Sequence, residues 1–331
     1  MAQAITIDQQ AALQRQFAMR KPASLWQDAW RRLIRNRASV AGLVILAILA
    51  LVAILAPVLA PHAPQQMFDG ETYRQATWVN LPNDPAHTGD PRFILGTDTI
   101  GRDVLSRVIY GARTSLAVGF IPLFFILLIG TSIGMFAGYR GGRVDNLLMR
   151  FTDIVYAFPD ILFFIIMMTA LRDTWLGQLL NGFFLLFVSL ALVSWVNVAR
   201  LVRGQVLSIK EKEYVEAARM IGASPIRIMM SHIFPNALAP LIVAAAFIVP
   251  NAILTEALLG FLGVGVRPTT DPFAPFPTSW GMLLLEGKVA IETQVWLLIA
   301  PAACVAIVML AFTFIGDGLR DALDPMMKGN S

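Results

Sequence analysis

Three ionisable side chains lie within stretches of the sequence that are otherwise strongly apolar. Asp153 and Asp160 stand seven residues apart, so they share one face if their stretch is a single helix, and Glu256 lies in a later stretch beyond Asn251. A charge among apolar residues is costly, and such groups line solute pathways or bond to neighbouring helices. Asp153 fits an interfacial position, within one turn of the end of its stretch. Asp160, Asn251 and Glu256 are candidates for a translocation pathway, with a structural helix–helix bond an equal alternative for Glu256.

Residues for enzymatic chemistry are absent from the sequence. A P-loop requires Gly-Lys followed by Ser or Thr, but the only Gly-Lys pair, at 287–288, is followed by valine. The single cysteine, Cys304, excludes an internal disulfide framework. The three histidines lack the spacing of a metal site; they are His62, His87 and His232. We therefore expect no catalytic residue, no metal site and no cofactor bound by this chain.

The composition places the chain in a membrane. Its 331 residues are 56% hydrophobic and only 15% charged, against about 25% charged in a typical soluble domain. Spanning the bilayer core takes roughly 20 predominantly apolar residues per helix. Six stretches qualify: 38–60, 115–138, 151–170, 174–199, 237–262 and 293–316. The predicted fold is therefore an all-α polytopic membrane protein with six transmembrane helices.

Lysine and arginine in the connections predict the orientation. They concentrate before the first span and after spans two and four, which the positive-inside rule makes cytoplasmic. The predicted order is a cytoplasmic segment (1–37), the first span (38–60), an extracytoplasmic loop (61–114), a five-helix core (115–316) that includes a cytoplasmic segment (200–236), and a cytoplasmic tail (317–331). Both termini are then cytoplasmic. Within the outer loop, residues 98–111 have an apolar face and predict an amphipathic helix on the membrane surface. A binding role is one alternative for this helix, and packing against the bundle is the plainer account.

The cytoplasmic segment contains EYVEAARMIGASPIRIMMSHIFP, residues 213–235. Residues 210–221 predict a helix that ends at Gly222, a residue that accepts a left-handed conformation. Ser224 and Pro225 are favoured as the N-cap and first residue of a second helix, which Pro235 ends or kinks. Apolar residues at helical spacing follow the cap; they are Ile226, Met229, Met230 and Ile233. Ala217 and Ala218 make one surface of the first helix flat and small, which lets another backbone or a groove approach closely, although an ordinary solvated loop helix is an equal alternative on these grounds.

The same residues resemble the EAA signature of ABC importer permeases. Glu216, Ala217, Ala218, Gly222 and Pro235 stand at the positions of that motif. The sequence departs from it where His232 replaces the usual isoleucine and Phe234 the usual leucine. Residues 96–116 and 316–325 are similar to hallmark segments of the dipeptide/oligopeptide (DppC/OppC-type) permeases, and the similarity extends over most of 95–328.

This resemblance implies a type I ABC importer permease with a MetI-like fold in the plasma membrane, the inner membrane of a Gram-negative cell. Its expected partners are a second homologous permease, two ATPase subunits that bind ATP and magnesium, and an extracytoplasmic substrate-binding protein; nucleic acid is not expected. The implied cargo is di- or oligopeptides, with nickel, glutathione or another small solute as alternatives. The five motif residues would couple the chain to the ATPases. A rival of another class is an ion-coupled secondary transporter using Asp160 and Glu256, which would not need a docking segment.

Overall fold

The computed structural model describes residues 25–269, 271 and 274–323. Within these ranges the secondary structure is helical apart from one isolated β-bridge between Thr97 and Asp103. Five stretches are long and apolar enough to cross a membrane. Their main helices are α3 (Arg37–Ile54), α5 (Val104–Arg140), α9 (Phe183–Ile209), α12 (Phe234–Phe261) and α14 (Trp296–Leu323). The prediction of an all-α fold with several membrane spans is confirmed.

The sixth predicted span is broken rather than continuous. α6 (Gly142–Tyr156) and α7 (Asp160–Ala170) meet at a bend of 73°, so the count is six only if this pair forms one span. Pro159 precedes α7 as its N-cap residue. Proline has no N–H to continue a preceding helix, and it also disfavours the helical conformation in the residue before it. The prediction of one helix over 151–170 is therefore wrong, and Asp153 and Asp160 do not share a helical face.

The helix predicted on the outer membrane surface is instead the beginning of α5. That helix starts at Val104, capped by the Asp103 side chain, and continues without a break to Arg140. Val104 and Val108 are buried inside the subunit. Part of the apolar face of 98–111 therefore packs inside the subunit, in agreement with the alternative of packing against the bundle, and the stretch is not a separate surface helix.

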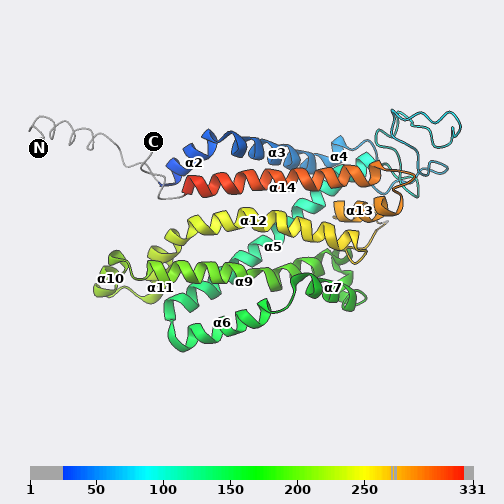
Figure 1. Ribbon diagram of the computed structural model, residues 1–331. Helices are drawn as coiled ribbons and strands as arrows, with labels where there is room; N and C mark the ends of the chain where they lie inside the picture. The colour runs from blue at the N-terminus through cyan, green and yellow to red at the C-terminus, as the bar shows by residue number, and fades with distance from the viewer. Residues whose placement is uncertain (1–24, 270, 272–273, 324–331) are drawn as a thin grey trace, which may run out of the picture.

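Shorter helices complete the chain at both ends of the bundle. They are α2 (Leu25–Arg35), α4 (Ala56–Leu59), α8 (Trp175–Gln178), the 3₁₀ turn η1 (Leu179–Gly182), α10 (Glu213–Met220), α11 (Pro225–Ile228), the π-helical turn η2 (Met229–Ile233) and α13 (Trp280–Val289). α13 was not predicted. α10 and α11 lie at the same end as α2, whereas α7, α13 and the loop after α4 lie at the opposite end (Figure 1).

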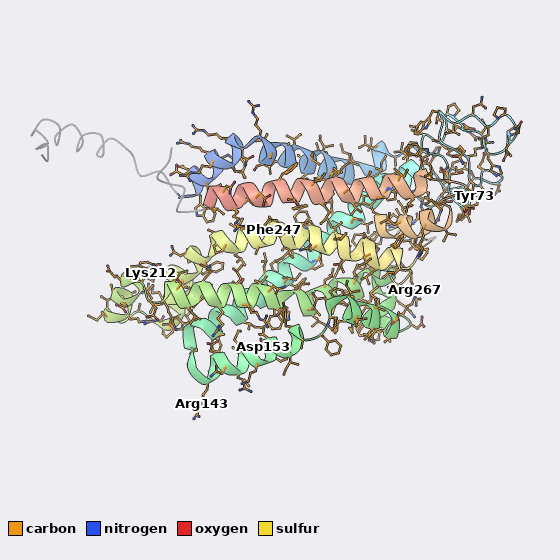
Figure 2. All side chains as sticks on the ribbon, viewed as in Figure 1. Tyr73, Arg143, Asp153, Lys212, Phe247 and Arg267 are labelled. Carbon is orange, nitrogen blue, oxygen red and sulfur yellow. The ribbon has the colours of Figure 1, made fainter. Side chains whose placement is uncertain are left out.

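The connections that the sequence predicts on one side of a membrane lie at one end of the bundle. Arg143 and Lys212, both from connections rich in lysine and arginine, lie toward the same end, and Tyr73 and Arg267 lie at the other (Figure 2). The described start of α2 and end of α14 lie at the end that carries Lys212. The connections predicted to be cytoplasmic therefore occupy one end of the molecule.

Small residues bring the central helices into close contact. A Cβ added at Gly130, Gly134 or Gly138 of α5 would lie 2.5–2.8 Å from atoms of α9. These glycines recur every four residues, the spacing that lets membrane helices approach backbone to backbone. Gly316 of α14 similarly accommodates Phe247 of α12, whose ring lies 2.7 Å from the position of an added Cβ (Figure 2). The long helices are thus held by packing of small residues against larger ones.

Candidate functional site: the α10–α11 segment and the buried polar residues

α10 and α11 form a compact helix–turn–helix at the end of the bundle. Gly222 has a φ of +81° and joins them. The N–H of Gly222 donates a hydrogen bond to the carbonyl of Arg219, and the N–H of Ala223 donates one to the carbonyl of Ala218. These two bonds are the Schellman pattern at a helix end. Ser224 then accepts a hydrogen bond from the N–H of Arg227, with Pro225 as the first helical residue. The predicted turn and cap are confirmed, while the first helix is shorter than the predicted 210–221.

The residues of the EAA signature fall on two sides of α10. Ala218 is buried, together with Val215, against α9 and the π turn η2. Glu216 and Ala217 are exposed. The alanine pair therefore serves two purposes, since one methyl group packs inside the subunit and the other remains on the surface available to a partner.

The tip of this segment is apolar and open. Met220 is 89% exposed, Ile221 86% and Ile226 70%. Together with Met230, which is also exposed, these residues form what we call the apolar tip. Large apolar side chains this exposed on a projecting element mark an interaction surface.

Pro235 does not end the second helix. α11 continues through the π turn η2 into α12, and Pro235 occupies the first turn of α12 on the surface. Proline lacks an N–H and cannot continue an α-helical ladder unaided, and a π turn commonly accompanies such a disruption. His232, which replaces the isoleucine usual in the motif, lies in this turn with its ring 6.4 Å from that of Tyr214.

Polar contacts connect the segment to the central helices. Lys210 donates a hydrogen bond of 3.2 Å to the carbonyl of Gly138 at the end of α5, and the guanidinium of Arg219 lies 5.8 Å from the ring centre of Tyr139. On the same side, Arg203 of α9 binds both carboxylate oxygens of Asp145 on α6, at 2.5 and 2.7 Å. A displacement of α10 therefore reaches α5 directly and α6 through α9.

Glu256 lies inside the subunit. Its side chain is 1% exposed, and Oε1 accepts a hydrogen bond of 2.6 Å from the Ser279 hydroxyl, the N-cap of α13. A residue that lines a passage between two subunits must lie on the surface of the single chain. The placement of Glu256 therefore supports the structural alternative rather than the pathway.

Asp160 and Asn251 are exposed, on α7 and α12 respectively, and so remain candidates for a pathway. Asp160 stands in the first turn of α7, where a negative charge is favoured by the helix dipole. Asp153 binds Arg200 at 2.6 Å on an exposed surface, in agreement with an interfacial role. The structure does not bring Glu256 onto the exposed surface with the other two candidates.

A buried ion-pair network at the opposite end was not predicted from the sequence. Arg107 is 1% exposed and binds both Asp98 and Glu286; its Nη2 lies 2.8 Å from Glu286 Oε1. Arg102 binds Asp98 at 2.6 Å and Glu286 at 3.2 Å. The network joins the outer loop, α5 and α13. The sequence contains a signal for this network, because Arg102 and Arg107 interrupt a stretch whose other face is apolar.

Metal ligands do not gather in the described ranges, where no group of three or more His, Cys, Asp or Glu side chains is suitably placed. His62 instead packs against the rings of Phe68 and Phe93 in the loop after α4. In the same loop, hydrogen bonds and the charge of the neighbouring Arg92 lower the pKa of Asp90 below its usual value. These loop contacts are those of an ordered structural element.

The bundle and its projecting helix–turn–helix define a multi-spanning membrane permease. A family model described as "Binding-protein-dependent transport system inner membrane component" matches residues 130–329, and another, "N-terminal TM domain of oligopeptide transport permease C", matches residues 24–82. The chain belongs to the family of binding-protein-dependent transport permeases. The sequence-based prediction of an ABC importer permease is confirmed, and an ion-coupled secondary transporter is excluded as its class.

Curated relatives are similar over nearly the whole chain. The oligopeptide transport system permease protein OppC of Haemophilus influenzae is 43% identical over 302 residues, covering 91% of this chain and 89% of that protein. The dipeptide transport system permease protein DppC of Bacillus subtilis is 40% identical, covering 94% and 89%. Among solved structures, an inward-facing MetNI methionine ABC transporter gives a TM-score of 0.53 at 21% identity, covering 66% of this chain and 97% of that one. The last likeness supports the MetI-like fold.

Proposed function

We propose that this chain is a permease subunit of an ATP-driven importer of di- or oligopeptides. The observation that carries the proposal is the apolar tip on α10 and α11, because it offers a separate subunit a docking surface connected to the central helices. Peptide cargo is supported by the names of the relatives, which include both oligopeptide and dipeptide permeases. Nickel, glutathione or another small solute is the alternative cargo.

The proposed complex contains a second, homologous permease, two ATPase subunits and an extracytoplasmic binding protein. The ATPases bind ATP and magnesium, so this chain itself carries no cofactor and catalyses no reaction. The end with α10 and α11 faces the cytoplasm together with both termini, and the end with α13 faces outward. The arginine-rich connections at the end with α10 and α11 support that orientation.

In the proposed mechanism, closure of the ATPases on ATP displaces the segment 200–236. Because Ala218 and Val215 are packed against α9 and the π turn, the segment moves as a unit with the helices that it joins, α9 and α12. Rotation of these helices relative to the partner permease makes access to the passage alternate from the outside to the inside. Asp160 and Asn251, both exposed, are the candidates for contact with the passing solute.

The docking step is tested by removing the apolar tip. Met220→Ser combined with Ile221→Ser changes two side chains that make little contact within the subunit, so the fold should survive. We expect loss of the ATPase subunits on copurification and loss of uptake. The matched control is Val289→Ser on α13, which is 75% exposed at the other end of the molecule and should leave the complex intact. Full copurification and full uptake by the tip variant would contradict the docking role.

The cargo is tested by uptake in cells that lack this gene and in cells complemented with it. Complementation should restore accumulation of labelled di- and tripeptides. Restored nickel or glutathione uptake without peptide uptake would overturn the peptide assignment and leave the permease assignment intact.

A further inference from the structure

α2 carries an apolar arc that its own subunit only half covers. Successive residues of a helix lie about 100° apart around its axis. On α2 a continuous apolar arc of about 140° therefore contains, in order around the helix, Ala29, Leu33, Trp26, Trp30 and Ile34. Ala29 and Leu33 pack against the last turns of α14 and are buried. The other half is open, because Trp26 is 47% exposed, Trp30 58% and Ile34 47%.

The rest of the α2 surface is polar and predominantly basic. It carries three arginines and one aspartate, namely Arg31, Arg32, Arg35 and Asp28. Gln27 borders the open apolar half and Arg31 follows it, roughly 60° around the helix from Ile34; both Arg31 and Arg35 are exposed. An exposed tryptophan with long basic side chains on its polar border is typical of a helix lying in the interface of a membrane.

The covalent structure fixes α2 at the height of the membrane surface. A single residue, Asn36, separates α2 from α3. The Asn36 side chain accepts hydrogen bonds from the N–H groups of Ala38 and Ser39 and so caps α3. Since α3 has no charged residue after Arg37 and is apolar enough to span the bilayer, its capped end lies at the interface. The end of α2 that adjoins Asn36 then lies within a few ångströms of the headgroups.

We propose that α2 is an interfacial helix that binds anionic phospholipid, with Trp30 and Ile34 inserted below the headgroups and Arg31 and Arg35 paired with lipid phosphates. The charge of the border favours this occupant over another subunit, since a purely apolar contact would gain nothing from arginines at its edge. The inference goes beyond the transport function and does not depend on the cargo. It would make the membrane anchor of this permease sensitive to lipid charge.

The test uses the full chain reconstituted in phosphatidylcholine vesicles, with its single native cysteine replaced by Cys304→Ala. An environment-sensitive fluorophore is attached in separate variants at Trp30→Cys or Ile34→Cys, and at Asp28→Cys as the polar-face control. Quenching is measured with equal fractions of brominated phosphatidylcholine or brominated phosphatidylglycerol. At positions 30 and 34 we expect quenching about twofold or more above that at position 28.

Phosphatidylglycerol should quench positions 30 and 34 more than phosphatidylcholine does. That excess should fall in about 1 M salt, where the Debye length is about 3 Å, and with Arg31→Gln combined with Arg35→Gln. Blue-shifted emission without quenching by either lipid would mean that another protein surface covers α2, and would overturn the proposal. Equal quenching by the two lipids at low salt would overturn the proposed preference of α2 for anionic phospholipid.

Discussion

The Ser279 hydroxyl donates a hydrogen bond of 2.6 Å to Glu256 and accepts one of 3.2 Å from the N–H of Met282. One side chain thus caps α13 and ties it to α12. The contact is close, since a Cβ at Gly281 would lie 2.6 Å from Glu256 Oε1. The positive end of the α13 dipole faces the carboxyl group and favours it there. The Glu256 side chain thus links α12 to the first turn of α13.

This relationship predicts different outcomes for two substitutions of Glu256. Glu256→Ala would leave a cavity and an unpaired Ser279 hydroxyl, lowering the free energy of unfolding by about 2 kcal/mol or more. Glu256→Gln retains an acceptor for Ser279 at the same place, so both stability and uptake should be largely kept. Thermal unfolding of the purified chain and uptake in cells measure the two effects. Unchanged thermal unfolding of Glu256→Gln with abolished uptake would assign Glu256 to the pathway after all.

The buried network at the end of the bundle that carries α13 predicts a large effect for Arg107→Gln. The substitution removes one of the two cations that Asp98 and Glu286 share and leaves Arg102 as the other; breaking a buried ion pair costs about 3–5 kcal/mol. Arg92→Gln is the control, because Arg92 pairs with Glu71 and Asp90 at the surface and its loss should change thermal unfolding little. Equal melting temperatures for the two variants would show that the network does not hold the outer loop to α5 and α13.

Several elements could be predicted because their signals are local. Apolar length gave the long helices, and the Gly222 turn with its Ser224 cap followed from backbone and capping preferences of single residues. The break between α6 and α7 also has a local cause, Pro159. In the sequence this signal for a break competes with an apolar run that is long enough to predict one continuous span.

The partners of Glu256 and Arg107 could not be predicted in the same way. Ser279 is 23 residues from Glu256, and Glu286 is 179 residues from Arg107. Such pairs depend on how α12, α13 and α5 pack, which neither periodicity nor composition of one segment specifies. For the same reason, the burial of Ala218 beside the exposure of Ala217 became apparent only in the folded chain.

The predicted orientation is tested by cysteine labelling in the Cys304→Ala background. Asn80→Cys and Lys212→Cys both place a thiol at an exposed position, so the folded chain should not hide either. In intact cells we expect a membrane-impermeant maleimide to label position 80 only, and position 212 to react after permeabilisation. Labelling of position 212 in intact cells would invert or otherwise overturn the proposed arrangement.

The turn between α10 and α11 predicts a selective loss of coupling in Gly222→Val. No atom outside the immediate chain lies within 4 Å of a Cβ added at Gly222, so the substitution meets no steric obstacle and acts only through the backbone. A φ of +81° costs a β-branched residue about 1–2 kcal/mol, enough to shift a two-helix element without unfolding the bundle. Asparagine tolerates such a conformation better, which makes Gly222→Asn the matched control.

In Gly222→Val the position of Ile226 and Met230 relative to Glu216 and Ala217 changes, because this one turn joins α10 to α11. We expect normal membrane insertion and expression, but ATP hydrolysis uncoupled from uptake, or release of the ATPase subunits. Gly222→Asn should retain most of both activities. ATPase activity and uptake in reconstituted vesicles, with copurification of the complex, measure the result. If the valine variant keeps full, substrate-stimulated hydrolysis and full uptake, the geometry of this turn is not what transmits ATPase motion to the permease.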